Sequence, residues 1–150
     1  MGRRWQARGP DTDFQASVLA QRRAAALGAG NARVRMDLAG LFLASAPEHP
    51  GRALEALRWV QEAVAACPTA PELRLEAARI RMKVLSHPEM LTAVSQAWAM
   101  DPPSAARRLM EQATGEMRSA LALDRQELDE GRRLQPREKA EAEAWVRGGP

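Results

Sequence analysis

The sequence predicts an all-α domain, and its composition, its helix-start signals and the spacing of its apolar residues agree on this. Alanine, the best helix former, makes up about a fifth of the 150 residues, while the chain has two Phe and no Tyr, aromatic residues that favour strands. A chain of this length forms one domain and buries roughly two-thirds of its unfolded surface. We therefore expect a single helical domain with its own apolar core.

Helix-start signals divide the chain into six expected helices. In TAPE (residues 69–72) and SHPE (86–89), a hydroxyl residue precedes a proline and stands three residues before a glutamate, as in a capped helix start. Asp101, in MDPP, is expected to cap a third helix that begins at Pro102. The expected helices cover residues 12–27, 32–46, 52–66, 71–85, 89–100 and 104–134, within a domain at 12–135 that follows a basic flexible arm at 1–11 and precedes a charged C-terminal tail at 136–150.

Two stretches of the chain repeat one pattern at a distance of 34 residues. The apolar stripe that begins at Leu57 recurs from Leu91. The small residue Ala63 next to the first stripe corresponds to Ala97 next to the second, and the prolines that follow the two stripes have the same separation. Small residues are expected where two helices approach closely, because a larger side chain would push their axes beyond the usual separation of about 8 to 10 Å. A chance match between alanine-rich helices is the alternative interpretation.

This pattern resembles the tetratricopeptide repeat, a unit of two antiparallel helices. LAGLF (38–42) is similar to the family's Leu-Gly-x-x-Tyr, and EALRWVQEAVAACP (55–68) is similar to its second helix and closing proline. The second copy departs from the pattern at Arg81, which replaces an aromatic residue. The resemblance implies repeats over about 32–70 and 71–104, stacked as a short α-solenoid with a long C-terminal capping helix.

In the family that the chain resembles, the first helices of successive repeats line a concave groove that binds peptides. Carried over to this chain, the groove is apolar at one end and basic at the other, which suits an extended or helical peptide with hydrophobic and acidic side chains. The partner-binding residues predicted in this way are Arg33, Met36, Leu43, Leu75, Arg79, Met82 and Lys83. The alternative is that the two methionines and two leucines of this set are buried beneath the N-terminal helix.

The sequence gives no sign of a catalytic centre. His49 and His87 lie beside prolines in turns, with no Ser, Cys or carboxylate at a spacing that suggests a triad. Cys67 is the only cysteine, so we interpret it as a small apolar residue at a helix end and expect neither an intrachain disulfide nor a cysteine pair that holds a metal. We expect a protein that is not an enzyme and that binds no cofactor and no metal.

The expected function is therefore that of an adaptor or scaffold that binds another protein or a peptide. One alternative is a helical bundle that forms a homo-oligomer, with Trp59, Trp98 and the long C-terminal capping helix at the interface. A less favoured alternative is nucleic-acid binding through the basic N-terminal end, which has seven arginines and two acids in 35 residues but no recognisable reader fold. A third alternative is that the chain is a soluble portion of a larger repeat protein or membrane-linked protein.

No membrane-targeting feature is evident in the sequence. The first residues are basic and polar and lack the apolar segment of a secretory signal. The most apolar run, LAGLFLASA (38–46), is less than half of the roughly 20 residues that span a bilayer. We expect a cytoplasmic protein with no membrane span.

Overall fold

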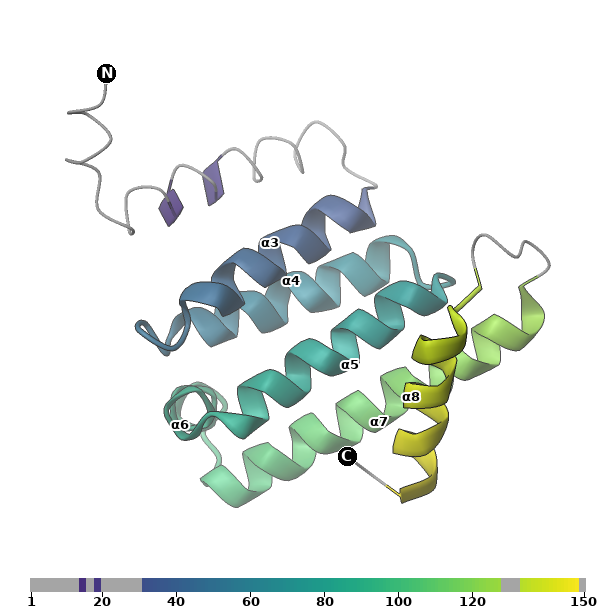
Figure 1. Cartoon of the computed structure of the whole chain (residues 1–150). Helices are drawn as coiled ribbons and strands as arrows, with labels where there is room; N and C mark the ends of the chain where they lie inside the picture. Colours follow the sequence, from purple (N-terminus) through teal and green to yellow (C-terminus); the bar gives the residue numbers. More distant parts are fainter. Residues whose placement is uncertain (1–13, 16–17, 20–30, 128–132, 149–150) are drawn as a thin grey trace.

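The chain folds, in its computed structural model, into a set of closely packed helices (Figure 1). The structure describes residues 14–15, 18–19, 31–127 and 133–148. Every regular element among these residues is a helix, which confirms the predicted all-α class. The helices are α3 (Ala32–Ser45), α4 (Arg52–Ala66), α5 (Pro71–Ser86), α6 (Pro88–Ala97), α7 (Pro102–Gln126) and α8 (Pro136–Gly148). None of the described helices is long and apolar enough to cross a membrane.

The predicted helix starts are confirmed in position but only partly in their capping. Pro71 is the first residue of α5, so the N-cap is Ala70, and Thr69 lies one residue too early to cap the helix. The cap predicted in SHPE is wrong for the same reason. Pro88 is the first residue of α6, so the N-cap is His87 and not Ser86. Asp101 does cap α7, where its Oδ2 accepts a hydrogen bond from the backbone N–H of Ser104 at 3.1 Å.

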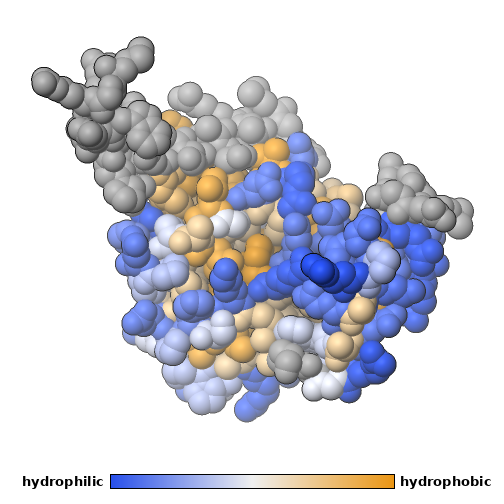
Figure 2. All heavy atoms as spheres, viewed as in Figure 1, coloured by the Kyte–Doolittle hydropathy of each residue, from blue (hydrophilic) through white to orange (hydrophobic). Residues whose placement is uncertain are grey.

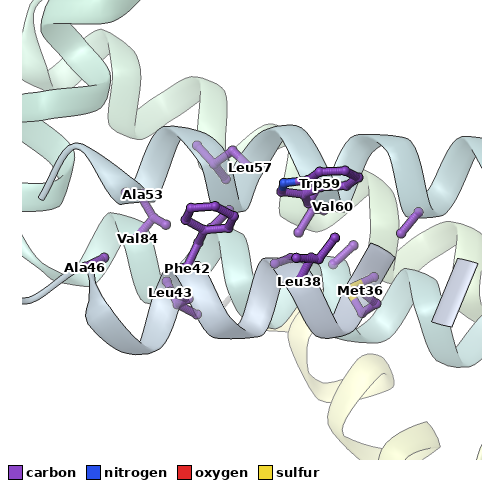
Figure 3. Packing of buried hydrophobic residues seen from close by; sticks show 14 of the residues in the cluster. Met36, Leu38, Phe42, Leu43, Ala46, Ala53, Leu57, Trp59, Val60 and Val84 are labelled. Carbon is purple, nitrogen blue, oxygen red and sulfur yellow. The ribbon is translucent and has the colours of Figure 1, made fainter. Parts of the chain in front are cut away.

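The hairpin of α3 and α4 buries the apolar stripes that the sequence predicts for it. Leu38 and Phe42 of α3 share one core cluster with Leu57 and Val60 of α4 (Figure 3). Ala63 is 0% exposed, as expected for a site where two helices approach closely. The bounds of α4 are those predicted.

The second predicted repeat does not form a hairpin of α5 and α6, because α5 packs most extensively along α7. With 10 residues, α6 is about 15 Å long, too short to cover the 16 residues of α5. The backbone enters the left-handed region at Ala99 (φ 53°), beyond the end of α6. Ala97 is exposed, so the close approach predicted there is wrong. A stack of equal tetratricopeptide-like hairpins is not confirmed.

The long helix after Asp101 packs by the stripe that the sequence predicts. Leu109, Ala113, Met117 and Ala120 of α7 are all 0% exposed. The helix ends at Gln126, eight residues before the predicted end at residue 134. α7 therefore packs along α5 and also supports the C-terminal helix α8.

The segment predicted as a charged tail forms α8, which lies across α5 and α7 (Figure 1). Its apolar residues Ala142, Trp145 and Val146 recur at helical spacing, so that one face of the helix can pack. Ala142 is fully buried, and all three residues belong to a second core cluster with Leu75 of α5 and Met117 of α7. Pro136 does begin a new element, but this element is part of the folded domain.

The described part of the N-terminal stretch reaches the main core. The Phe14 ring meets Phe42 edge-on, with centroids 5.5 Å apart, and Val18 is buried. Residues 14–15 and 18–19 are helical, within the helix predicted over 12–27. The arm predicted at 1–11 lies outside the described residues.

Candidate partner-binding site

The seven predicted partner-binding residues fall into a buried and an accessible group. Met36, Leu43 and Leu75 are 3%, 9% and 0% exposed, so they belong to the core. This corrects the expectation that they line an open groove, since their side chains are already covered by the chain itself. The accessible group contains the half-buried Met82 and the exposed Arg33, Arg79 and Lys83.

The two halves of the predicted groove belong to different core clusters. Met36 and Leu43 belong to the main core cluster, which also contains Val18 of the N-terminal stretch and residues of α4, α5 and α6. Leu75 belongs to the second cluster, together with Ala142 of α8. On the α5 half, the C-terminal helix therefore contributes to the burial of the predicted groove.

Arg33 links α3 to α5 through ion pairs. Its Nη2 donates to Oε2 of Glu76 at 2.5 Å, its Nη1 lies 3.7 Å from a carboxylate oxygen of Glu72, and its Nε lies 3.3 Å from Asp37 on its own helix. Three carboxylates thus surround one guanidinium. The charge of Arg33 is balanced within the chain, which makes it a poor candidate for recognising an acidic partner.

Arg79 is paired with a carboxylate of α8. Its Nε donates to Oε1 of Glu141 at 3.1 Å and its Nη2 donates to Oε2 at 2.5 Å, so that guanidinium and carboxylate meet side by side. This hydrogen bonding raises the pKa of Arg79 and lowers the pKa of Glu141. The acidic group that the sequence predicts for Arg79 is therefore supplied by the chain's own C-terminal helix.

Trp145 provides the second polar contact of α8. Its indole Nε1 donates to Oγ1 of Thr114 on α7 at 3.2 Å, while its ring packs against the second core cluster. α8 thus contacts α5 through a charge pair and α7 through an aromatic anchor. We call the surface beneath it the α5–α7 face, which consists of Leu75, Arg79, Met82, Ala113, Thr114 and Met117.

Lys83 lies one helical turn from Arg79 on α5 and is exposed. Within the described ranges, no carboxylate forms an ion pair with its ammonium group. Figure 2 shows hydrophilic side chains over much of the half of the molecule that carries α8. Arg79 of the α5–α7 face is therefore paired with α8, whereas Lys83, which borders this face on α5, forms no ion pair with the described residues of α8.

Asp124 holds the chain segment that leads into α8. Its carboxylate is 1% exposed and accepts a hydrogen bond from the backbone N–H of Leu134 at 2.7 Å, with Nη2 of Arg133 at 3.4 Å. Sequence reasoning missed this residue. A signal was present, because an acid in the last turn of a helix is disfavoured by the helix dipole unless another contact compensates.

A buried polar network joins α5 to α7. Arg81, 8% exposed, donates through Nη1 to Oε1 of Gln112 at 2.8 Å, and its Nη2 lies 3.7 Å from Glu116. Arg74 donates to the other carboxylate oxygen of Glu116 at 3.0 Å. Burial lowers the pKa of Arg81, and the charge of Glu116 opposes this. α7 therefore supplies the polar partners of the buried Arg81 side chain.

The two tryptophans proposed for an oligomer interface do not form an exposed aromatic patch. Trp59 is 7% exposed and lies in the main core. Trp98 is half-buried, and the Arg108 guanidinium lies over its ring at 4.3 Å from the centroid. The self-associating bundle therefore finds no support in these residues.

The residues weighed for chemistry follow the ends of three different helices. His49 is exposed in the turn after α3, where it lines a shallow pocket with Phe14 and Leu41. His87 contacts the Lys83 carbonyl oxygen through Nδ1 at 2.8 Å. Cys67 is half-buried at the end of α4. Over the described residues, no group of three His, Cys, Asp or Glu side chains is placed to hold a metal ion.

Comparison with known proteins gives no family, curated protein or solved structure that matches the chain significantly.

Proposed function

We propose that the chain is a non-enzymatic interaction module that binds a helix or peptide of another protein on the α5–α7 face. The observation that supports this proposal is the seating of α8, an amphipathic helix held by the Arg79–Glu141 pair and by the Trp145 hydrogen bond. Helix recognition commonly uses an aromatic anchor, an arginine and an apolar floor. Here the bound helix supplies the aromatic anchor, Trp145, and the face supplies Arg79 and the apolar floor.

The chemistry of the face favours an acidic ligand. The planar guanidinium of Arg79 matches a carboxylate with two parallel hydrogen bonds, as it does with Glu141. Lys83 extends the positive charge by one turn along α5. Leu75 and Met82 lie with them and provide apolar contact. The ligand class that fits is an amphipathic helix or peptide with acidic and hydrophobic residues.

The proposal is tested by affinity capture from the source cell with the tagged full chain and mass spectrometry. Arg79→Glu combined with Lys83→Glu reverses the sign of the face, so that an acidic partner is repelled and its recovery should fall strongly. Both residues are exposed, so the free energy of unfolding should change little, apart from at most about 1 kcal/mol for the lost ion pair.

The matched control is Arg107→Glu combined with Arg118→Glu, which makes the same change in net charge at two exposed positions of α7. The control should capture the same proteins as the parent chain, with circular dichroism melting curves confirming that both variants are folded. Equal recovery by a folded Arg79/Lys83 variant and by the control would refute the proposed face.

A further inference from the structure

We infer that α8 is a built-in competitor, and that the α5–α7 face takes from another protein a helix with a carboxylate followed four residues later by a tryptophan. This inference rests on the proposed function and specifies the partner and the regulation of the same face. It is based on how α8 is bound, how weakly it is bound, and which cation it leaves unpaired.

The contacts of α8 define a recognition pattern. Glu141 pairs with Arg79, the next residue, Ala142, is fully buried, and Trp145 bonds to Thr114. Val146 completes the apolar contact. Because positions i, i+1, i+4 and i+5 share one side of a helix, a partner helix with an acid, a small residue, a tryptophan and an aliphatic residue at this spacing presents the same surface.

The attachment of α8 is slight compared with that of the other helices. Ala142 is the only fully buried residue among the 13 of α8, whereas α7 buries a continuous stripe. The Arg79–Glu141 pair is 44% and 38% exposed on its two side chains, and water weakens pairs of that exposure. Segments with few buried contacts open more readily than the core. α8 can therefore leave while the remaining helices stay folded.

A partner helix fits the face better than the α8 of a second copy. The connection through residues 127–135 gives α8 a local concentration on the order of mM, an advantage that an identical helix from another copy lacks. A partner with a second carboxylate in reach of Lys83 would gain an ion pair that α8 does not make. Arg79 and Lys83 together thus favour a helix more acidic than α8.

The experiment uses a fluorescein-labelled peptide of residues 134–148 as the probe and measures its binding to the full chain by fluorescence polarisation. In the parent chain, α8 competes with the probe. In the variants Trp145→Ala and Glu141→Lys, α8 is loosened by two different means, and each should bind the probe about tenfold more tightly than the parent. Arg137→Glu, a charge reversal at an exposed position of α8, should bind like the parent.

A charge exchange tests the recognition pattern itself. Introducing Arg79→Glu into the Trp145→Ala chain should abolish binding of the probe, and a probe carrying Glu141→Arg should restore it. Equal affinity of the parent and the two loosened chains, or no binding by any of them, would overturn the inference. A stable dimer of the parent chain by light scattering, lost in Trp145→Ala, would assign the face to a second copy and also overturn it.

The outcomes separate this inference from the proposed function. If partner capture depends on Arg79 and Lys83 but the probe binds no chain, the interaction module stands and the α8 pattern is wrong. If the probe competes as expected but capture from cells is insensitive to the face, α8 is a displaceable helix and the proposed function fails.

Discussion

Asp124→Ala is expected to release α8 while the core of α3, α4 and α5 stays folded. The Asp124 carboxylate is 1% exposed and bonds to the Leu134 N–H at 2.7 Å. A hydrogen bond to a charged group contributes about 1.5 to 3 kcal/mol, and the substitution also leaves the Leu134 N–H without its acceptor. The Arg133 contact, at 3.4 Å to a half-exposed guanidinium, adds little. We therefore expect the free energy of releasing α8 to fall by about 2 kcal/mol.

Amide hydrogen exchange followed by mass spectrometry measures this release directly. A fall of about 2 kcal/mol corresponds to roughly 30-fold faster exchange in residues 136–148, with exchange in α4 unchanged. Asp124→Asn keeps an oxygen that can accept from the Leu134 N–H, so its effect should be smaller. Exchange of α8 at the parent rate in Asp124→Ala would show that this carboxylate does not hold the helix.

Two further predictions concern the core and the response to pH. Ala63→Leu should lower the free energy of unfolding by about 1 to 3 kcal/mol because Ala63 is 0% exposed. Ala97 is exposed, so Ala97→Leu should lower the free energy of unfolding by less than about 0.5 kcal/mol. Equal losses for the two variants in chemical denaturation would contradict the packing of α6. The hydrogen bond from Arg79 holds the pKa of Glu141 below its ordinary value of 4.5. The ion pair therefore stabilises α8 fully above pH 4.5, and this stabilisation is lost as the pH falls through the lower pKa that Glu141 has in the folded state. Exchange in α8, corrected for its intrinsic pH dependence, should therefore rise in acid, and an identical rise in Glu141→Gln would assign it to another group.

The first hairpin could be predicted from the sequence because its determinants are local. The stripe of Leu57 and Val60 and the small Ala63 follow the helical period within a single helix, and all three are buried in the structure. The stripe of α7 is confirmed for the same reason. The periodicity of apolar residues shows which side of a helix is apolar, and this is sufficient to predict which residues of that helix are buried.

The helix that packs along α5 could not be predicted in this way. The 34-residue match between Ala63 and Ala97 is a similarity along the chain, and it does not specify which helix packs against which. α7 is long enough to cover α5 and supplies Gln112 and Glu116 to Arg81, whereas α6 is too short. Tertiary packing thus outweighed the repeat.

The candidate site depended on pairings that are far apart in the sequence. The sequence predicts that Arg79 binds an acid, but that acid, Glu141, is 62 residues away, in a stretch whose composition predicts a solvated tail. Charged helices with few apolar residues are normally interpreted as solvent-exposed. The spacing of Ala142, Trp145 and Val146 was the only local sign that this helix had a face to bury.

The seat of α8 across α5 and α7 also sets the time course of any binding at that face. A partner enters only after α8 has left, so the observed association rate should stop rising with partner concentration once it reaches the rate at which α8 opens. Local openings of this kind take from microseconds to about a second. In a chain with α8 loosened, the rate should instead keep rising with concentration over the same range. The parent chain would then take up its partner at a pace fixed by its own last helix, however abundant the partner is.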